Sequence, residues 1–75
     1  MTLFDGCENQ TYKITAIKTE DEALRHRLFS LGITKDCHIF LERFSSNKAT
    51  LAIQVNQTKI ALRDSEAQHI FVETI

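Results

Sequence analysis

The chain has 75 residues, of which 43% are hydrophobic and 25% charged, so it suits one small globular domain over residues 1–75 and not a disordered segment. Nine basic residues against ten acidic ones give a net charge of −1, which argues against nucleic-acid binding through phosphate contacts. No apolar run approaches the ~20 residues that span a bilayer, and the first residues lack the basic start and apolar core of a signal peptide. We therefore expect no membrane insertion and a cytoplasmic location.

The first half of the chain predicts a strand followed by the main helix. Residues Tyr12–Ile17 alternate polar and apolar side chains and favour a strand. Thr19 and Glu22 stand at the spacing of a capping box and predict a helix from about Glu20 to Leu31. Gly32 then supplies a residue that ends a helix in the left-handed conformation without steric cost. The apolar stripe of this helix consists of Leu24, Leu28 and Leu31.

The second half predicts four strands with short connections. The expected strands are Cys37–Phe44, Thr50–Val55, Thr58–Leu62 and Ile70–Glu73. Ser45–Lys48 reads as a turn, and Asn56-Gln57 as a tight two-residue connection in which Asn tolerates a positive φ. Between the last two strands, Asp64–Ala67 predicts one helical turn with Asp64 as its cap.

Five short strands, one helix and one helical turn leave too few residues for a parallel layered sheet. We therefore expect a mainly β fold, a small and strongly bent five-stranded antiparallel barrel, whose closure would also remove exposed strand edges. The leucine stripe of the helix should plug one open end of this barrel. The side chains expected to point inward are Ile14, Ile39, Leu41, Leu51, Ile53, Val55, Ile60, Leu62, Ile70 and Val72.

Taken in order, several motifs make the whole chain similar to one family. They are Leu3 to Gly6, Arg27-Leu28-x-x-Leu31-Gly32, Ile60-Ala61-Leu62-Arg63 and Ile70-x-Val72. Through them the chain resembles the FeoA family, small cytoplasmic proteins of bacterial ferrous-iron uptake. The resemblance implies a five-stranded antiparallel SH3-like barrel with one α-helix after strand one and a short helical turn before the last strand. The chain departs from the family at Lys35-Asp36, where Pro-Gly is usual, and at Ser45–Ala49, which replaces a Pro/Gly-rich loop.

The resemblance also implies a function and a partner. The chain would be an accessory interaction module that docks on the cytoplasmic region of the membrane transporter FeoB and changes its assembly or conformational equilibrium. A second hypothesis follows from the same barrel in metal-dependent repressors, where it is a C-terminal module. In that case the chain would be a metal-sensing or peptide-binding regulatory module.

The sequence contains no motif typical of a metal site or of a catalytic site. The soft-ligand candidates are His26, His38, His69, Cys7 and Cys37, and none of them forms a chelating pair such as Cys-x-x-Cys or His-x-x-x-His. We expect two reduced cysteines, with Cys37 a small residue within a strand, and neither a metal site nor a cofactor. The chain has no nucleophile elbow and no glycine-rich phosphate loop, so we expect a protein that is not an enzyme.

Aromatic placement yields the candidate partner-binding residues, which are Arg25, His26 and Phe29. Phe29 lies roughly 140° around the helix from Leu24, on its polar side, and an exposed aromatic beside charged groups is typical of a docking anchor. On the strands, Phe40, Phe44 and Phe71 likewise alternate away from the aliphatic face. The alternative is that Leu3 and Phe4, or the helices, cover these rings as a second small core.

Charged residues near the helix have simpler expected roles. We expect Arg25 and Arg27 to pair with Asp21 and Glu22 within the helix. Arg63 is expected to form an ion pair or a hydrogen bond to loop carbonyls, and the alternative is that it binds a partner.

Overall fold

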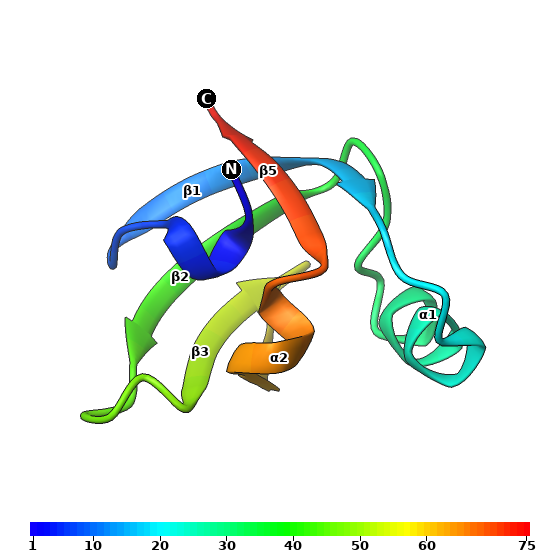
Figure 1. Cartoon of the computed structure of the whole chain (residues 1–75). Coiled ribbons are helices and arrows are strands. Elements are labelled where there is room, and N and C mark those ends of the chain that lie inside the picture. The colour runs from blue at the N-terminus through cyan, green and yellow to red at the C-terminus, as the bar shows by residue number, and fades with distance from the viewer.

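A computed structural model describes all of residues 1–75 and contains one five-stranded antiparallel sheet with two helices (Figure 1). The strand order is β4-β3-β2-β1-β5. The strands are β1 (Gln10–Ile17), β2 (His38–Phe44), β3 (Thr50–Val55), β4 (Thr58–Arg63) and β5 (Ile70–Thr74). The helices are α1 (Glu22–Ser30) and α2 (Asp64–Ala67), and a 3₁₀ turn, η1, spans Leu3–Asp5. Neither helix combines the length and the apolar character needed to cross a membrane.

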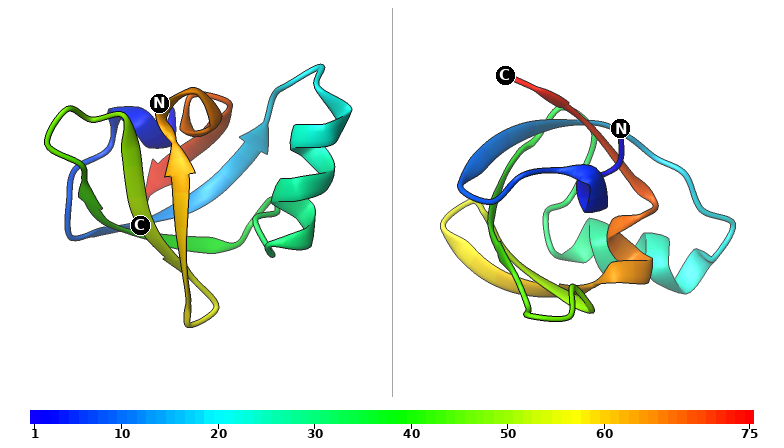
Figure 2. Two further views of the ribbon diagram at one scale, coloured as in Figure 1. Left: turned by 90° about the horizontal axis from the view of Figure 1, so that it is seen from below. Right: turned by 60° about the vertical axis from the view of Figure 1, so that its left-hand side comes forward.

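The strand content, the antiparallel order and both helical segments confirm the predicted fold class, but the sheet does not close. Strands β4 and β5 stand at the two ends of the strand order and do not pair with each other. The chain instead passes between them through α2, which fills the opening (Figure 2). Register shifts between Ile14 and Ala16 and between Leu41 and Arg43 mark bulges, which increase the bend of a sheet. The expectation that closure removes both edges was therefore wrong.

The outer edge of β5 is partly covered by the N-terminal segment. Thr2 forms a bridge with Phe71, and the backbone N–H of Val72 donates to the Met1 carbonyl at 2.9 Å. Asp5 fixes the start of this segment, because its carboxylate accepts hydrogen bonds from the backbone N–H and the hydroxyl of Thr2. These two hydrogen bonds lower the pKa of Asp5. No strand lies along the outer edge of β4.

The core consists of fourteen hydrophobic side chains and contains no buried polar residue. Nine of the ten expected inward residues are buried, and the exception, Ile60, is half-buried. Of the remaining five core residues, Leu28 was expected from the helical stripe, and the other four were not expected; they are Leu3, Tyr12, Ile33 and Ala67. The hydroxyl of Tyr12 accepts a hydrogen bond from the Cys7 N–H at 2.7 Å, so its polar end is satisfied.

Both helices begin at a residue other than the expected cap. The cap of α1 is Asp21, whose carboxylate accepts from the N–H groups of Ala23 and Leu24 at 3.0 and 3.2 Å. Thr19 was the wrong choice, because its hydroxyl accepts from the Asp21 N–H and so shapes the preceding turn. A carboxylate also suits the positive end of a helix better than a hydroxyl does.

Helix α2 has the expected bounds, but its cap lies one residue earlier than expected. Arg63 occupies its cap position, and the Glu66 carboxylate accepts from the Arg63 N–H at 2.9 Å, so Asp64 is not the cap. The expected strand bounds need shifts of at most two residues. One of these places Cys37 just before β2, where it is half-buried.

Helix α1 ends in a Schellman motif. Gly32 has a φ of 84°, and its N–H donates to the Phe29 carbonyl at 3.0 Å. The Ile33 N–H donates to the Leu28 carbonyl at 2.9 Å, and both of these side chains are completely buried. This is the pair of hydrogen bonds, with its apolar partner residues, that defines the motif.

Leu28 and Ile33 therefore seal the end of the barrel that the leucine stripe was expected to plug. Leu28 is the one buried residue of α1, whereas Leu24 and Leu31 are half-buried at the margin of the core. The expected stripe fails at its end because the helix stops at Ser30 and the left-handed turn brings Ile33 inward in place of Leu31.

Replacing Leu28 by alanine should lower the free energy of unfolding by about 2–5 kcal/mol, because the change removes a completely buried side chain. Leu24→Ala and Leu31→Ala should each cost clearly less, since both side chains are half-buried. Urea denaturation of the three variants checks this order. A Leu28→Ala protein as stable as the parent would contradict the sealing role.

Candidate functional site

A groove of about 500 Å³ runs between helix α1, the end of strand β1 and the segment that follows the helix. It is lined by Arg25 and Phe29 on α1, by Thr15–Ile17 on β1 and by Ile33–Lys35 of the segment after the helix. Four of the eight lining residues are hydrophobic. The structure thus brings two of the predicted partner-binding residues, Arg25 and Phe29, to one apolar groove.

Phe29 is the most exposed large apolar side chain of the protein, with 73% of its surface in solvent. The hydrogen bonds that end α1 fix Leu28 inward, and Phe29 lies about 100° further around the helix, off the buried face. This confirms the position expected from helical phase. The alternative, a cover formed by Leu3 and Phe4, is wrong for Phe29.

That alternative does hold for another phenylalanine. Leu3 is part of the core, and the ring of Phe4 packs edge-on against Phe44 with 5.9 Å between ring centroids. The Lys48 ammonium lies 5.0 and 4.5 Å from the centroids of the Phe4 and Phe44 rings, within cation–π range. The N-terminal segment thus builds a small second cluster with the end of β2 and the turn after it.

The β1 side of the groove exists because β1 is longer than its pairing with β2. That pairing ends at Lys13 and His38, after which Ala16 and Ile17 pair with β5 alone and Thr15 is the bulge residue. The half-buried side chains of Ala16 and Ile17 therefore reach the surface where no second strand covers them. Sequence reasoning did not find this wall, because neither the bulge after Ile14 nor the late start of β2 has a local signal.

The charged residues of α1 do not pair as expected. Asp21 caps the helix, Arg25 donates to the Thr19 carbonyl, and Arg27 forms an ion pair with Glu66 of α2. Pairing of the arginines within the helix was therefore the wrong interpretation. An ion pair within the helix would have needed the Asp21 carboxylate. That carboxylate instead accepts hydrogen bonds from backbone N–H groups of the first turn, which have no partner inside the helix.

His26, the third predicted partner-binding residue, does not line the groove. It is exposed on α1, and its carbonyl accepts from the Ser30 hydroxyl at 2.8 Å. The groove is thus lined by Arg25 and Phe29 together with β1 residues, whereas His26 is exposed to solvent outside it.

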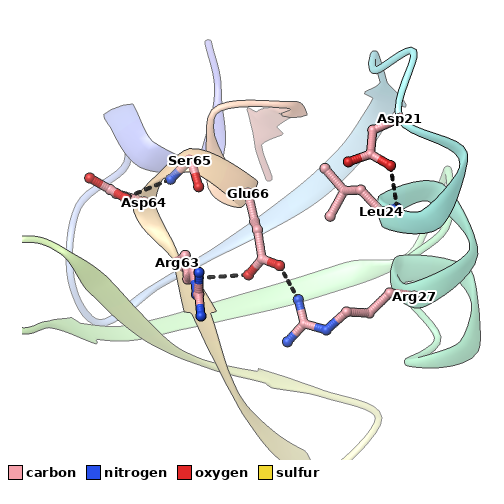
Figure 3. A network of polar contacts seen from close by, with 7 residues as sticks. All are labelled: Asp21, Leu24, Arg27, Arg63, Asp64, Ser65 and Glu66. Atoms are coloured by element: carbon pink, nitrogen blue, oxygen red, sulfur yellow. Dashed lines mark hydrogen bonds and ion pairs between the residues drawn. The ribbon is translucent and has the colours of Figure 1, made fainter.

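A second cleft, of about 600 Å³, separates α1 from α2 and is mostly polar. Glu66 lines this cleft, and Figure 3 shows its carboxylate accepting from the side chain of Arg27 and from the backbone N–H of Arg63. The side chain of Arg63 is exposed and forms neither an ion pair nor a hydrogen bond to a loop carbonyl, so the role expected for it was wrong. Its backbone N–H makes the hydrogen bond to Glu66, and the charge of its guanidinium adds a smaller contribution that also lowers the pKa of Glu66.

The Glu66 network ties α1 to α2 across the opening of the barrel. Partial burial alone would raise the pKa of Glu66, but the hydrogen bonds from Arg63 and Arg27 outweigh it and hold the pKa below its ordinary value of 4.5. A carboxylate with a lowered pKa in the folded protein stabilises the fold while it is ionised.

The stabilisation by Glu66 should therefore be complete above about pH 4.5 and disappear as the pH falls through the lowered folded-state pKa. Glu66→Gln should lower the free energy of unfolding at pH 7, and the difference from the parent protein should shrink under acid conditions. Chemical denaturation of both proteins across this range measures it. A difference that stays constant with pH would show that ionisation of Glu66 plays no part.

The candidate metal ligands remain dispersed in the folded chain. No three His, Cys, Asp or Glu side chains form a group that could hold a metal ion. Both cysteines are free thiols, with Cys7 exposed and Cys37 half-buried near the Thr34 hydroxyl. His69 contacts the Lys18 carbonyl through Nδ1 at 2.9 Å.

Treatment with a chelator should leave the melting temperature of the purified protein unchanged, because its fold has no preformed metal site to lose. Thermal unfolding with and without chelator, followed by titration with Fe²⁺ and Zn²⁺, is the measurement. Tight stoichiometric binding with a gain in melting temperature would reverse this prediction.

Comparisons with known proteins agree with the motif resemblance. A protein-family model described as "FeoA domain" matches residues 1–74. A curated relative from Helicobacter pylori strain J99, named "Putative Fe(2+) transport protein A", is 40% identical over 73 residues, which are 97% of this chain and 94% of the relative. The family expected from the sequence is confirmed.

Solved structures confirm the fold. The FeoA protein of Stenotrophomonas maltophilia, solved in complex with zinc and described as a procaryotic SH3 domain protein, superposes with a TM-score of 0.84 at 26% identity. The match covers 97% of this chain and 89% of that protein. A manganese-dependent transcriptional repressor superposes with a TM-score of 0.92 at 17% identity, over all of this chain and 41% of the repressor. The expected SH3-like architecture is thus shown, and the repressor shares the fold alone.

Proposed function

This chain belongs to the FeoA domain family, and we propose that it is an accessory module of bacterial ferrous-iron uptake that docks on the cytoplasmic region of a FeoB-type transporter. The observation that carries the proposal is the exposed ring of Phe29 at the mouth of an apolar groove, with Arg25 on the same wall. Aromatic residues and arginine are enriched at the energetic centres of protein interfaces. The relatives' name, Fe(2+) transport protein A, supplies the process in which such an interface would act.

The proposed mechanism is conformational and not chemical. A module of 75 residues in the cytoplasm can change the assembly or the conformation of a transporter only if it binds one state more tightly than the other. The Stenotrophomonas protein is described as a candidate ferrous iron transport activating factor, which fits a role of this kind. On this proposal the chain is not an enzyme and needs no cofactor.

Metal sensing is the weaker hypothesis for this chain. The repressor likeness rests on fold at 17% identity, and no group of ligand side chains comes together here. The zinc in the Stenotrophomonas structure belongs to that protein. The Fe²⁺ and Zn²⁺ titration described above separates the two hypotheses.

Copurification tests the proposal directly. Tagged protein isolated from iron-starved cells should bring down the transporter, and its cytoplasmic region, expressed alone, should bind the purified chain. Failure of both experiments would overturn the proposal.

Phe29→Ala should weaken binding to the transporter's cytoplasmic region by at least about tenfold, as expected for an aromatic anchor. It should change the free energy of unfolding by less than about 0.5 kcal/mol, since the side chain is exposed. Calorimetric titration and urea denaturation of the same variant measure both effects. Ile75→Ala is the matched control, because Ile75 is 72% exposed and lies outside the groove. A large loss of stability without a binding defect would contradict the docking role of Phe29.

A further inference from the structure

The charges of the groove beside Phe29 all have one sign. Arg25 stands on its α1 wall and Lys35 in the segment after the helix, and no carboxylate is among the eight lining residues. The chain as a whole carries a net charge of −1, so this positive rim is a local feature. An apolar floor between two cations selects its occupant by charge as well as by shape.

No nearby carboxylate forms an ion pair with Arg25 or Lys35. Glu20 and Asp21 line a neighbouring pocket together with Arg25, whose guanidinium donates to the Thr19 carbonyl. Asp36 follows Lys35 in sequence, but its carboxylate pairs with Lys13, at 3.7 Å from the Lys13 Nζ. Glu22 belongs to the first turn of α1 and is not among the lining residues. Lys35 is exposed and takes part in no ion pair, so its ammonium is free to meet a partner.

The floor of the groove calls for an apolar group. Ile33 is completely buried beneath it, and Ala16 and Ile17 are half-buried along it. Together with the ring of Phe29 they can take up a bulky apolar side chain and remove it from water. A space of about 500 Å³ suits a few side chains of a short segment.

We infer that the groove binds a segment of its protein partner in which a bulky apolar side chain stands beside aspartate or glutamate residues. The apolar side chain enters between Phe29 and Ile17, and the carboxylates meet Arg25 and Lys35 at the rim. This inference rests on the proposed function and adds the chemistry by which the partner is recognised. A nucleic acid would satisfy the two cations but would leave the apolar floor without a matching group.

Three fluorescent peptides of equal length test the inference on the full chain. Each carries a central Phe-Leu pair, flanked by aspartates in the first, serines in the second and lysines in the third. At low salt the aspartate peptide should bind at least about tenfold tighter than the lysine peptide, and added salt should reduce the difference. Amide shifts in NMR spectra should change at Thr15–Ile17 and Ile33–Lys35, which locates the peptide in the groove.

Charge reversals supply the matched variants. Arg25→Glu and Lys35→Glu should each weaken the aspartate peptide and strengthen the lysine peptide. Arg43→Glu, an exposed change on β2 outside the groove, should alter neither. The inference is overturned if the serine peptide binds as tightly as the aspartate peptide, if no peptide binds, or if an oligonucleotide displaces the bound peptide. It is equally overturned if sedimentation shows that Phe29 holds a second copy of this chain in the groove.

The same variants separate this inference from the proposed function. If the transporter's cytoplasmic region loses affinity for Phe29→Ala but binds Lys35→Glu like the parent chain, docking stands and acidic recognition fails. If the aspartate peptide binds in the groove while the transporter's cytoplasmic region does not bind the chain, the recognition chemistry stands and the proposed partner fails.

Discussion

The hydrogen bond from the Ile33 N–H to the Leu28 carbonyl, with both side chains completely buried, is the constraint on which the remaining features of this molecule depend. It closes the helix through the left-handed Gly32 and seals the open end of the barrel. It also turns the chain toward the start of β2. Leu28 points inward, and Phe29, about 100° further around the helix, is exposed, so the same turn fixes the residue that stabilises the fold and the residue offered to a partner.

Helix α1 divides its surface between these two tasks. It gives one buried residue to the core, and Arg27 holds it to α2 through Glu66 (Figure 3). The face that carries Arg25 and Phe29 takes little part in folding and lies beside the uncovered end of β1. Side chains on this face can be substituted without unfolding the protein, because the core does not depend on them.

The sequence allowed prediction of those features that depend on residues close together in the chain. Strand β3 and the helical turn Asp64–Ala67 have the predicted bounds, and Asn56 and Gln57 adopt the positive φ values of a tight hairpin. The exposure of Phe29 followed from helical phase. The burial of Leu3 depends on distant packing, and Arg27 pairs with a residue 39 positions away. Tyr12 shares the inward face of β1 with Ile14, so strand alternation could have predicted its burial. The β1 wall of the groove depends on a bulge and on where β2 begins, so periodicity could indicate the anchor but not the groove around it.

The N-terminal segment along β5 has a consequence for self-association. Growth of a fibre by strand addition requires every molecule to offer two free edges, one to accept a neighbour and one to pass the addition on. Here the bridge between Thr2 and Phe71 and the bond from Val72 to Met1 occupy one of them, which leaves β4. While that segment stays in place, two molecules that paired through their β4 edges would have no free edge left. Strand addition would then end at a dimer and could not produce a filament.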